Sequence, residues 1–389
     1  MQTNKEQRLY TPGPVTVPHR VRAAAALPMI HHRSPEFHAV YASCIENMQW
    51  LLGTKQDVLL AHTSGRGAME ACITNLLCKG DAAATVVNGN FGVMFAKIAK
   101  AYGVTTHPVL ADWTRPFAGE AAAAELAAVL KANPGIKAVT ICHNDTANSV
   151  ENDIRLAASV AHEQGAMLFV DGVSSVGCAL LEFDEWGIDA LATASQKGLM
   201  SPAGVSFVAL SDRAWEAAGR SDLPRYFTDF TAIRNKFHEK AGAPETPGST
   251  PVLQVRCVAE ALSMIREEGR AEVFARHERL AAAIRAGLTA MNLEIVPANA
   301  QRPSKSVTTF LLPSGVNGAA VRSALLDDFG IRIAGGLGEY KDSTLRIGHM
   351  GYFFDADALC VISALEAALF RLGVLFEPGR GIAACMKAL

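Results

Sequence analysis

The sequence contains no CxxC pair, although it has eight cysteines among its 389 residues. The cysteines are scattered and several lie within apolar runs, which is typical of reduced core residues. This spacing favours neither a disulfide-bonded frame nor a zinc site. We therefore expect a cytoplasmic protein without a bound metal.

The chain also lacks an excess of charge of one sign and long apolar runs. Charged residues make up 19% of the chain, the net charge is −2, and basic residues form no long cluster. We therefore expect no binding to nucleic acid or to an anionic membrane surface. No stretch approaches about 18 uninterrupted apolar residues, and the polar N-terminus has no apolar signal segment, so we expect neither a membrane span nor secretion.

Short apolar runs alternate with helical periodicity over roughly residues 55–210. The runs lie at 58–61, 85–87, 137–142, 167–171, 188–192 and 205–210, with helical spacing at 68–77 and 120–131 between them. This alternation predicts an α/β fold with a mostly parallel sheet that is covered on both faces. We expect an N-terminal arm over residues 1–20 and a large domain over residues 21–255.

The C-terminal part of the chain has a different pattern. Residues 225–251, which are rich in charges, aromatics and prolines, predict an irregular crossing loop. Long helices are predicted at 252–268 and 271–291. Shorter strand candidates follow at 306–312 and 344–348, with a helix at 318–329 between them. This order predicts a smaller α+β domain over residues 256–389.

Two polar side chains follow buried strands of the predicted sheet. Lys197 comes after the apolar run 188–194, and Asp171 ends the run 166–170. A lysine among semi-buried neighbours has a lowered pKa and forms a Schiff base readily. Separately, the two residues also fit a surface lysine and a helix-capping aspartate. Together they fit pyridoxal chemistry, which needs a lysine for the aldehyde and a carboxylate for the pyridinium nitrogen.

A third strand end indicates an anion pocket. Ser64 and Gly65 follow an apolar run and open a predicted helix, where free backbone N–H groups attract a phosphate, and Arg66 adds a positive charge. An ordinary strand-to-helix turn fits this segment as well. A dinucleotide-binding loop is a further alternative, because Gly65 and Gly67 begin a GxGxxG-like pattern, but Glu70 stands at its third glycine.

Other strand ends also carry candidate site residues. Phe91 follows the second strand and can stack on a flat ring, with Val173 on the opposite face, although by itself a core phenylalanine explains it better. The segment 143–149 brings six hydrogen-bonding side chains together at a strand end. Arg346, between two apolar residues, suits a substrate carboxylate or a structural salt bridge.

These motifs together resemble the class V pyridoxal-phosphate aminotransferases, especially the branch of alanine–glyoxylate, serine–glyoxylate and serine–pyruvate enzymes. The resemblance covers nearly the whole chain, in the right order. The segments that carry it are Thr11-Pro12-Gly13-Pro14, His32-Arg33-Ser34-Pro35, Ser64-Gly65, Ala68-Met69-Glu70, Asn88-Gly89-Asn90-Phe91-Gly92, Val170-Asp171-Gly172-Val173-Ser174-Ser175, Ser195-Gln196-Lys197 and Arg346-Ile347-Gly348-His349-Met350-Gly351. It implies pyridoxal-phosphate fold type I and a homodimer whose active sites are built from both subunits.

The resemblance also implies a role for each site residue. Lys197 forms the internal aldimine with pyridoxal 5'-phosphate, Asp171 contacts the pyridine nitrogen, Phe91 and Val173 sandwich the ring, and Thr146 lies near the ring hydroxyl. The substrate carboxylate binds Arg346. The phosphate is held by Ser64, Gly65, Arg66 and Gln196, together with Ser249 and Thr250 of the partner subunit.

The activity implied is the ping-pong transfer of an amino group from a small amino acid, such as alanine or serine, to a 2-oxo acid, such as glyoxylate or pyruvate. Alternatives on the same fold are a pyridoxamine–pyruvate aminotransferase and a lyase. A non-catalytic pyridoxal-binding sensor is a further alternative, from a different class of protein.

The sequence departs from the family pattern at three positions. Asp145 and Ser149 stand where the family has a glutamate and a glycine, and Gly248 stands where it has a tyrosine. The pair Asp145-Thr146 also resembles the pyridoxamine–pyruvate aminotransferases, but Leu337 occupies the place of an additional arginine in those enzymes. The departures leave the substrate class open.

Overall fold

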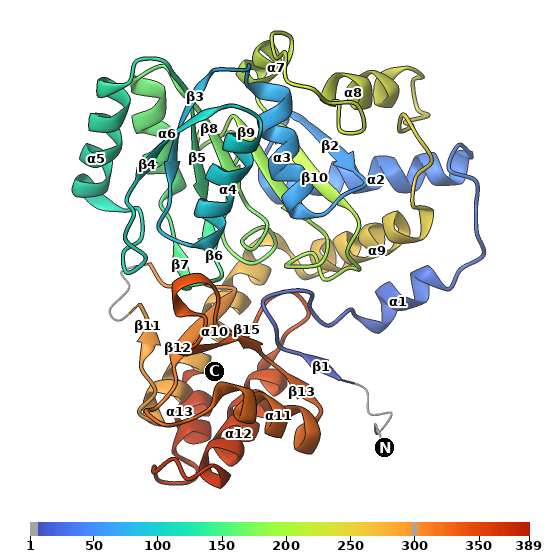
Figure 1. Ribbon diagram of the computed structural model, residues 1–389. Coiled ribbons are helices and arrows are strands. Elements are labelled where there is room, and N and C mark those ends of the chain that lie inside the picture. Colours follow the sequence, from blue (N-terminus) through green and yellow to red (C-terminus); the bar gives the residue numbers. More distant parts are fainter. Residues whose placement is uncertain (1–6, 298–301) are drawn as a thin grey trace.

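The computed structural model describes residues 7–297 and 302–389. A seven-stranded sheet, covered by helices on both faces, forms the upper part of the molecule in Figure 1. Its strands are β2 (Asp57–Ala61), β3 (Ala82–Val86), β4 (Thr105–Val109), β5 (Ile136–Cys142), β8 (Met167–Asp171), β9 (Ala190–Ala194) and β10 (Ser206–Leu210). Their order is β2-β10-β9-β8-β5-β3-β4, and only β10 runs antiparallel to its neighbours. The predicted mostly parallel sheet is confirmed.

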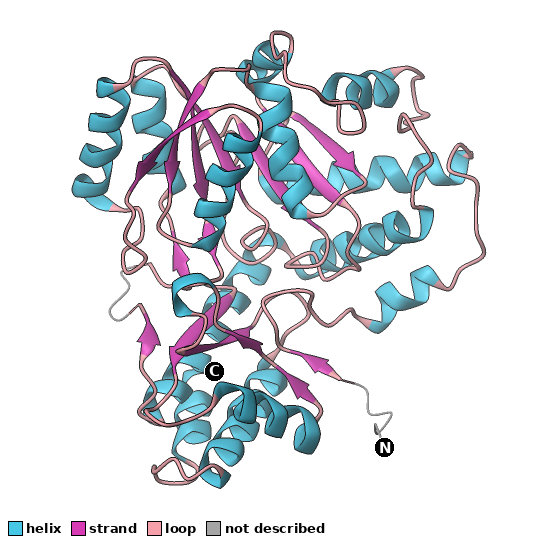
Figure 2. Cartoon of the chain, viewed as in Figure 1, coloured by secondary structure: helices cyan, strands magenta, loops and turns pink. Residues whose placement is uncertain are grey.

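Side chains alternate between the two faces of this sheet, as in any extended strand. In β10, Phe207 and Ala209 join one core and Val208 and Leu210 join the other. The first core is covered by α2 (Pro35–Leu52), α5 (Gly119–Ala132), α6 (Ile154–Glu163) and α9 (Val252–Glu268). The second is covered by α3 (Gly65–Leu76), α4 (Asn90–Ala101), α7 (Asp212–Ala218) and α8 (Phe230–His238). The sheet is therefore a buried platform with helices on both sides (Figure 2).

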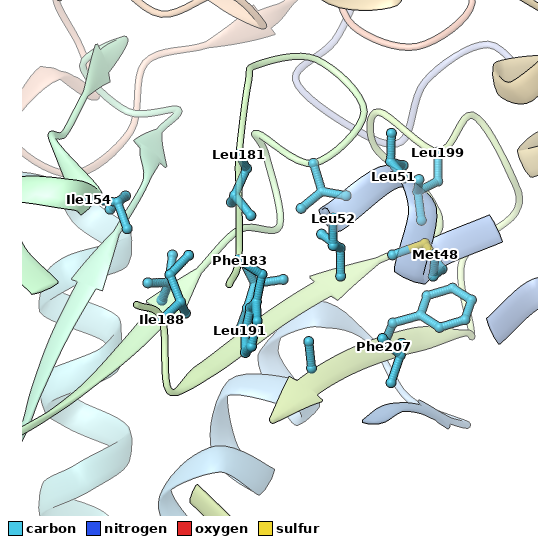
Figure 3. Close-up of a cluster of buried hydrophobic side chains, with 14 of the residues drawn as sticks. Met48, Leu51, Leu52, Ile154, Leu181, Phe183, Ile188, Leu191, Leu199 and Phe207 are labelled. Atoms are coloured by element: carbon cyan, nitrogen blue, oxygen red, sulfur yellow. The ribbon is translucent and has the colours of Figure 1, made fainter. Parts of the chain in front are cut away.

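Large apolar side chains fill the first core. Figure 3 shows Met48 and Leu52 of α2 near Phe207 of β10, with Phe183 beside Leu191. Each of these side chains is at most 1% exposed. Burial of a side chain of this size contributes about 1.5–3 kcal/mol, so this core anchors the strand ends that carry the site.

The stretch 225–251 is less irregular than predicted, because it contains α8. Asp229 caps this helix by accepting a hydrogen bond from the N–H of Ala232 at 2.9 Å, and Phe230 and Ile233 are buried in the second core. The many charged residues of the segment obscured this short amphipathic pattern.

A second, antiparallel sheet lies below the first in Figure 1, with the order β11-β12-β15-β14. Its strands are β11 (Ile295–Val296), β12 (Val307–Leu311), β14 (Ala334–Gly335) and β15 (Thr344–Gly348). The helices of this part are α10 (Arg270–Ala290), α11 (Gly318–Phe329), α12 (Asp355–Arg371) and α13 (Arg380–Ala388), with the 3-10 turn η1 (Gly338–Tyr340). These elements match the expected smaller α+β arrangement.

The N-terminal segment joins this second part. Strand β1 (Arg8–Leu9) pairs in parallel with β13 (Ile331–Arg332), and α1 (His19–Ala25) then packs against α9. A short hairpin of β6 (Asn144–Asp145) and β7 (Val150–Glu151) follows β5 on the side facing the second sheet (Figure 1). None of the helices in the described residues is long and apolar enough to span a membrane.

The long helices connect the core around the large sheet with the core of the smaller sheet. The predicted domain boundary after residue 255 falls within α9, whose buried Cys257 and Leu262 belong to the core around the large sheet. Helix α10 contributes Val273 to that core and Leu280 to the core of the smaller sheet. We therefore propose that the boundary lies within α10.

Candidate active site

A cavity of about 350 Å³ lies at the carboxyl edge of the large sheet. Strands β2, β3, β5, β8 and β9 run in one direction, so the loops that follow them meet at this edge, where ligands of parallel sheets bind. The cavity is lined by Gly13, Pro14, Ser64, Gly65, Arg66, Met69, Phe91, Met94, Asp171, Val173, Ser174, Gln196, Lys197 and Ala203. The structure thus brings together most of the predicted site residues.

Lys197 reaches this cavity from the turn after β9. Its Nζ donates a hydrogen bond to the carbonyl of Pro12, in the N-terminal segment that crosses over it. Gly13 has φ +98°, and a side chain there would place Cβ 2.3 Å from Lys197 Cδ. Only glycine fits this crossing. Burial lowers the pKa of Lys197 to about 8, although Asp171 nearby raises it. A lysine with this pKa has about a tenth of its amine in the neutral form at pH 7, far more than an exposed lysine.

Asp171 ends β8 and is 2% exposed. Its Oδ1 accepts the N–H of Val173 at 2.9 Å, and its Oδ2 lies 3.5 Å from the thiol of Cys142. Burial raises the pKa of Asp171 to about 6, which the hydrogen bond from Val173 partly opposes. Oδ2 has only this weak thiol partner, so it can still accept a hydrogen bond from a strong, charged donor.

The start of α3 forms another wall of the cavity. Ser64 is the N-cap residue, and its side chain makes no capping hydrogen bond, so the N–H groups of the first turn remain free for an anion. Gly65 packs against Val173, since a Cβ there would lie 2.5 Å from Val173 Cγ2. Arg66 lies beside Ser64 and is exposed. Gln196 contributes a buried Oε1 without a hydrogen-bond partner among the described residues.

Arg346 and Thr146 lie outside the residues that line the cavity. Arg346, on β15, donates from Nε to the carbonyl of Gly335 at 2.7 Å and from Nη1 to the carbonyl of Thr146 at 2.9 Å. Burial lowers the pKa of Arg346 to about 10, while Asp145 raises it. Its charge acts on Lys197, so the two are electrostatically coupled. Thr146 therefore meets this arginine through its carbonyl oxygen.

Ser249 and Thr250 do not line the cavity of their own chain. Ser249 is exposed, whereas Thr250 is buried and shares a hydrogen bond with Thr246. The preceding Glu245 forms an ion pair with Arg33, which anchors the crossing segment. Their predicted role in the partner's site requires a second copy of the chain.

The three departures from the family pattern occupy different surroundings. Asp145 is fully buried on β6. Ser149 has φ +60°, a conformation that favours glycine, and its hydroxyl lies 2.6 Å from that of Thr309. A glycine would adopt this positive φ with less strain than a serine. Gly248 lines a second cavity of about 390 Å³ with His62, Tyr226 and other residues, apart from Lys197.

Several lining residues were not predicted from the sequence. Gly13 and Pro14 come from the N-terminal segment, while Met69, Met94 and Ala203 complete the walls. The segment Thr11-Pro12-Gly13-Pro14 carries a signal, since a glycine between two prolines marks a tight turn. Methionine and alanine give no comparable signal. The described part of the chain contains no group of three or more His, Cys, Asp or Glu residues suited to a metal ion.

Comparison with known proteins places the chain in a family. The aminotransferase class V model matches residues 18–341. A protein of Synechococcus sp. (strain PCC 6716) named as the small subunit of a soluble hydrogenase is 37% identical, and the match covers 98% of each chain. The L-aspartate–glyoxylate aminotransferase of Paracoccus denitrificans is 34% identical, over 97% of this chain and 95% of the relative.

A solved structure agrees with these relatives. The pyridoxamine–pyruvate aminotransferase of Mesorhizobium loti has a TM-score of 0.92 and 26% sequence identity, covering 100% of this chain and 98% of the other. The match spans both the large sheet with its cavity and the smaller sheet with Arg346. The chain belongs to the aminotransferase class V family.

Proposed function

We propose that the chain is a pyridoxal-phosphate-dependent aminotransferase that transfers the amino group of a small amino acid, such as alanine or serine, to glyoxylate or pyruvate. The observation that carries this proposal is the placement of Lys197 and Asp171 in one cavity, each with a shifted pKa. Lys197 can react with an aldehyde, and Asp171 can pair with a protonated ring nitrogen. The name of the Synechococcus relative, a hydrogenase subunit, describes that protein and is not transferred to this chain.

The residues of the cavity fit this cofactor. The free N–H groups at the start of α3 suit its phosphate, and the side-chain amide of Gln196, which lines the same cavity, can donate a hydrogen bond to it. Asp171 has a carboxylate oxygen for a protonated ring nitrogen, and Phe91 and Val173 supply apolar contacts for a ring. The lysine that would bind the aldehyde is Lys197.

When bound, pyridoxal phosphate supplies an electron sink for a carbanion at the substrate Cα. The ionised carboxylate of Asp171 would keep the ring nitrogen protonated and so strengthen this sink. The neutral Nζ of Lys197 would take the proton from the substrate Cα and then release it, so this lysine would act as a base and as an acid in turn. Arg346 would bind the carboxylate of the substrate and so orient the substrate. The carbonyl groups of Gly335 and Thr146 hold Arg346 in place.

A pyridoxamine–pyruvate transfer is the second candidate function. The fold match to the Mesorhizobium loti enzyme and the pair Asp145-Thr146 favour it. The open helix start at Ser64 opposes it, because a cup that binds the phosphate is needed for a phosphorylated cofactor and not for the free vitamin.

A screen of amino donors against glyoxylate and pyruvate tests the proposed function. We expect the absorbance of the bound cofactor to change with alanine or serine and to return with a 2-oxo acid. Arg346→Ala should raise KM for both substrates by roughly ten- to a hundredfold, since it removes a charged hydrogen bond. Aspartate and free pyridoxamine complete the donor set.

Two controls accompany this screen. Arg332→Ala, on strand β13, which pairs with β1, removes an exposed arginine and should leave KM unchanged. Conversion with pyridoxamine alone would overturn the small-amino-acid proposal in favour of the second candidate. No spectral change with any donor would overturn both.

We also propose a homodimer in which Ser249 and Thr250 contact the phosphate in the partner's site. Their position away from their own cavity supports this. A Lys197→Ala chain and a Ser249→Ala/Thr250→Ala chain, mixed by refolding, should recover activity, because each mixed dimer contains one intact site. We expect roughly a quarter of the wild-type activity at limiting cofactor. A monomer in sedimentation, or no recovery, would contradict the proposal.

A cytoplasmic location remains a prediction. All eight cysteines are free thiols, a state that a reducing compartment maintains.

A further inference from the structure

Helix α4, which carries Phe91, begins without a capping side chain of its own. Its N-cap residue is Gly89, so no side-chain oxygen of the N-cap can accept the free N–H groups of the first turn. Asp145 supplies this cap from β6: its Oδ2 accepts the N–H of Phe91 at 2.7 Å, and its carboxylate also accepts the N–H of Gly92. A carboxylate at this position also interacts favourably with the helix dipole.

The carboxylate of Asp145 is fully committed to backbone groups. Its Oδ1 accepts the N–H of Ala147 at 2.9 Å, and the residue is 0% exposed. Gly89 makes room for it, since a Cβ at that position would lie 2.3 Å from Asp145 Cγ. Asp145 therefore contacts α4 and its own hairpin, and is shielded from solvent.

The other side of the same hairpin holds Arg346. The carbonyl of Thr146, the residue after Asp145, accepts Nη1 of Arg346 at 2.9 Å. The N–H of Ser149 closes the turn on the carbonyl of Asp145 at 2.9 Å. The hairpin thus bridges the first turn of α4, which packs on the large sheet, and strand β15 of the smaller sheet.

We propose that Asp145 is a positioning residue that sets Phe91 against the cofactor ring and, through Thr146, sets Arg346 for the substrate carboxylate. This inference rests on the proposed function. Asp145, which stands where the family has a glutamate, thus has a geometric role. Both of its carboxylate oxygens accept backbone N–H groups, so neither is left to bind a substrate. The choice of substrate then falls to other residues of the pocket.

The fit between Asp145 and Gly89 explains why an aspartate suits this chain. A glutamate would add one methylene between the hairpin and the backbone of Gly89, where even a Cβ has no room. Overpacking of this kind displaces backbone. We expect Asp145→Glu to disturb Phe91 and Arg346 although it keeps the charge.

The first measurement uses the protein without cofactor. Asp145→Asn keeps the shape of the side chain but leaves one amide nitrogen facing backbone donors. Amide hydrogen exchange at Phe91 and Ala147 should accelerate by at least about tenfold, the loss expected for a hydrogen bond to a charged group. The matched control is Asp189→Asn, which removes another buried carboxylate that accepts a backbone N–H. Asp189 precedes β9, at the end of that strand away from Lys197.

The second measurement uses the loaded enzyme. In Asp145→Asn, the dissociation constants of pyridoxal phosphate and of pyridoxal should rise by a similar factor of about ten, because the defect lies at the ring and not at the phosphate. KM for the amino acid should rise together with them, by about three- to tenfold. Asp189→Asn should change none of these constants.

Gly89→Ala provides an independent variant, since it displaces the Asp145 carboxylate without changing any charge. It should reproduce the faster amide exchange at Phe91, the weaker binding of pyridoxal phosphate and pyridoxal, and the higher KM for the amino acid. It can therefore replace Asp145→Asn if that variant does not fold. The inference is overturned if folded Gly89→Ala keeps wild-type exchange, dissociation constants and KM. Failure of the proposed function gives a different result: the wild-type protein binds no pyridoxal phosphate, while the exchange effect persists.

Discussion

Lys197→Ala should abolish transamination, with a loss of at least about a thousandfold in the rate of each half-reaction. The substitution removes both the amine that binds the cofactor aldehyde and the base that moves the proton at Cα. Absorbance of the bound cofactor on addition of an amino acid measures this loss. Reduction with borohydride in the presence of pyridoxal phosphate should also label a single peptide of the wild-type protein, the one containing Lys197.

The pH dependence of this labelling tests the environment of the lysine. Because burial lowers the pKa of Lys197 to about 8, its neutral fraction, and hence the labelling rate, should reach half of its maximum near pH 8 and level off above about pH 9. An ordinary lysine, with a pKa of 10.5, would continue to gain beyond that pH. Lys100→Ala, an exposed lysine on α4, is the matched control and should keep full activity and labelling. Labelling of Lys197→Ala at the wild-type level would contradict the assignment.

Asp171→Asn should lower the transamination rate by about a hundred- to a thousandfold while it stabilises the cofactor-free protein. The amide cannot keep the ring nitrogen protonated, so the cofactor becomes a weaker electron sink. Asp171→Glu should retain more activity than Asp171→Asn, because it keeps the charge. Stopped-flow absorbance of the half-reaction measures both variants.

The stability effect follows from the raised pKa of Asp171. Its folded-state pKa of about 6 lies above the ordinary 3.8, so the protonated form is the one that favours folding. That contribution is complete below about pH 4 and is lost as pH rises through about 6. Above that pH the penalty amounts to as much as about 3 kcal/mol, from a shift of about two pKa units.

Denaturant unfolding of the cofactor-free proteins measures this effect. Asp171→Asn should exceed the wild-type free energy of unfolding at pH 8 and approach it near pH 4. A difference that stays constant across this range would contradict the raised pKa. The carboxylate of Asp189 accepts hydrogen bonds from a backbone N–H and a side-chain hydroxyl, so Asp189→Asn should instead lower the free energy of unfolding.

Strongly periodic segments were predictable from the sequence because local pattern decides them. Strand β8 (Met167–Asp171), helix α9 (Val252–Glu268) and helix α11 (Gly318–Phe329) have the predicted bounds. Strand β4 (Thr105–Val109) was missed because it lies at the sheet edge, is largely exposed and contains Pro108. Helix α8 was missed because its apolar face is short and flanked by charges.

The same distinction separates the parts of the site. The sequence alone determined that Lys197 and Asp171 follow neighbouring buried strands, and the common direction of those strands brings their ends together. Their roles toward the cofactor remain predictions. Only the tertiary structure decided that Gly13 crosses Lys197 and that Asp145 caps the helix of Phe91, 54 residues away in sequence. Contacts of this kind depend on how separate elements pack, and no local periodicity records them.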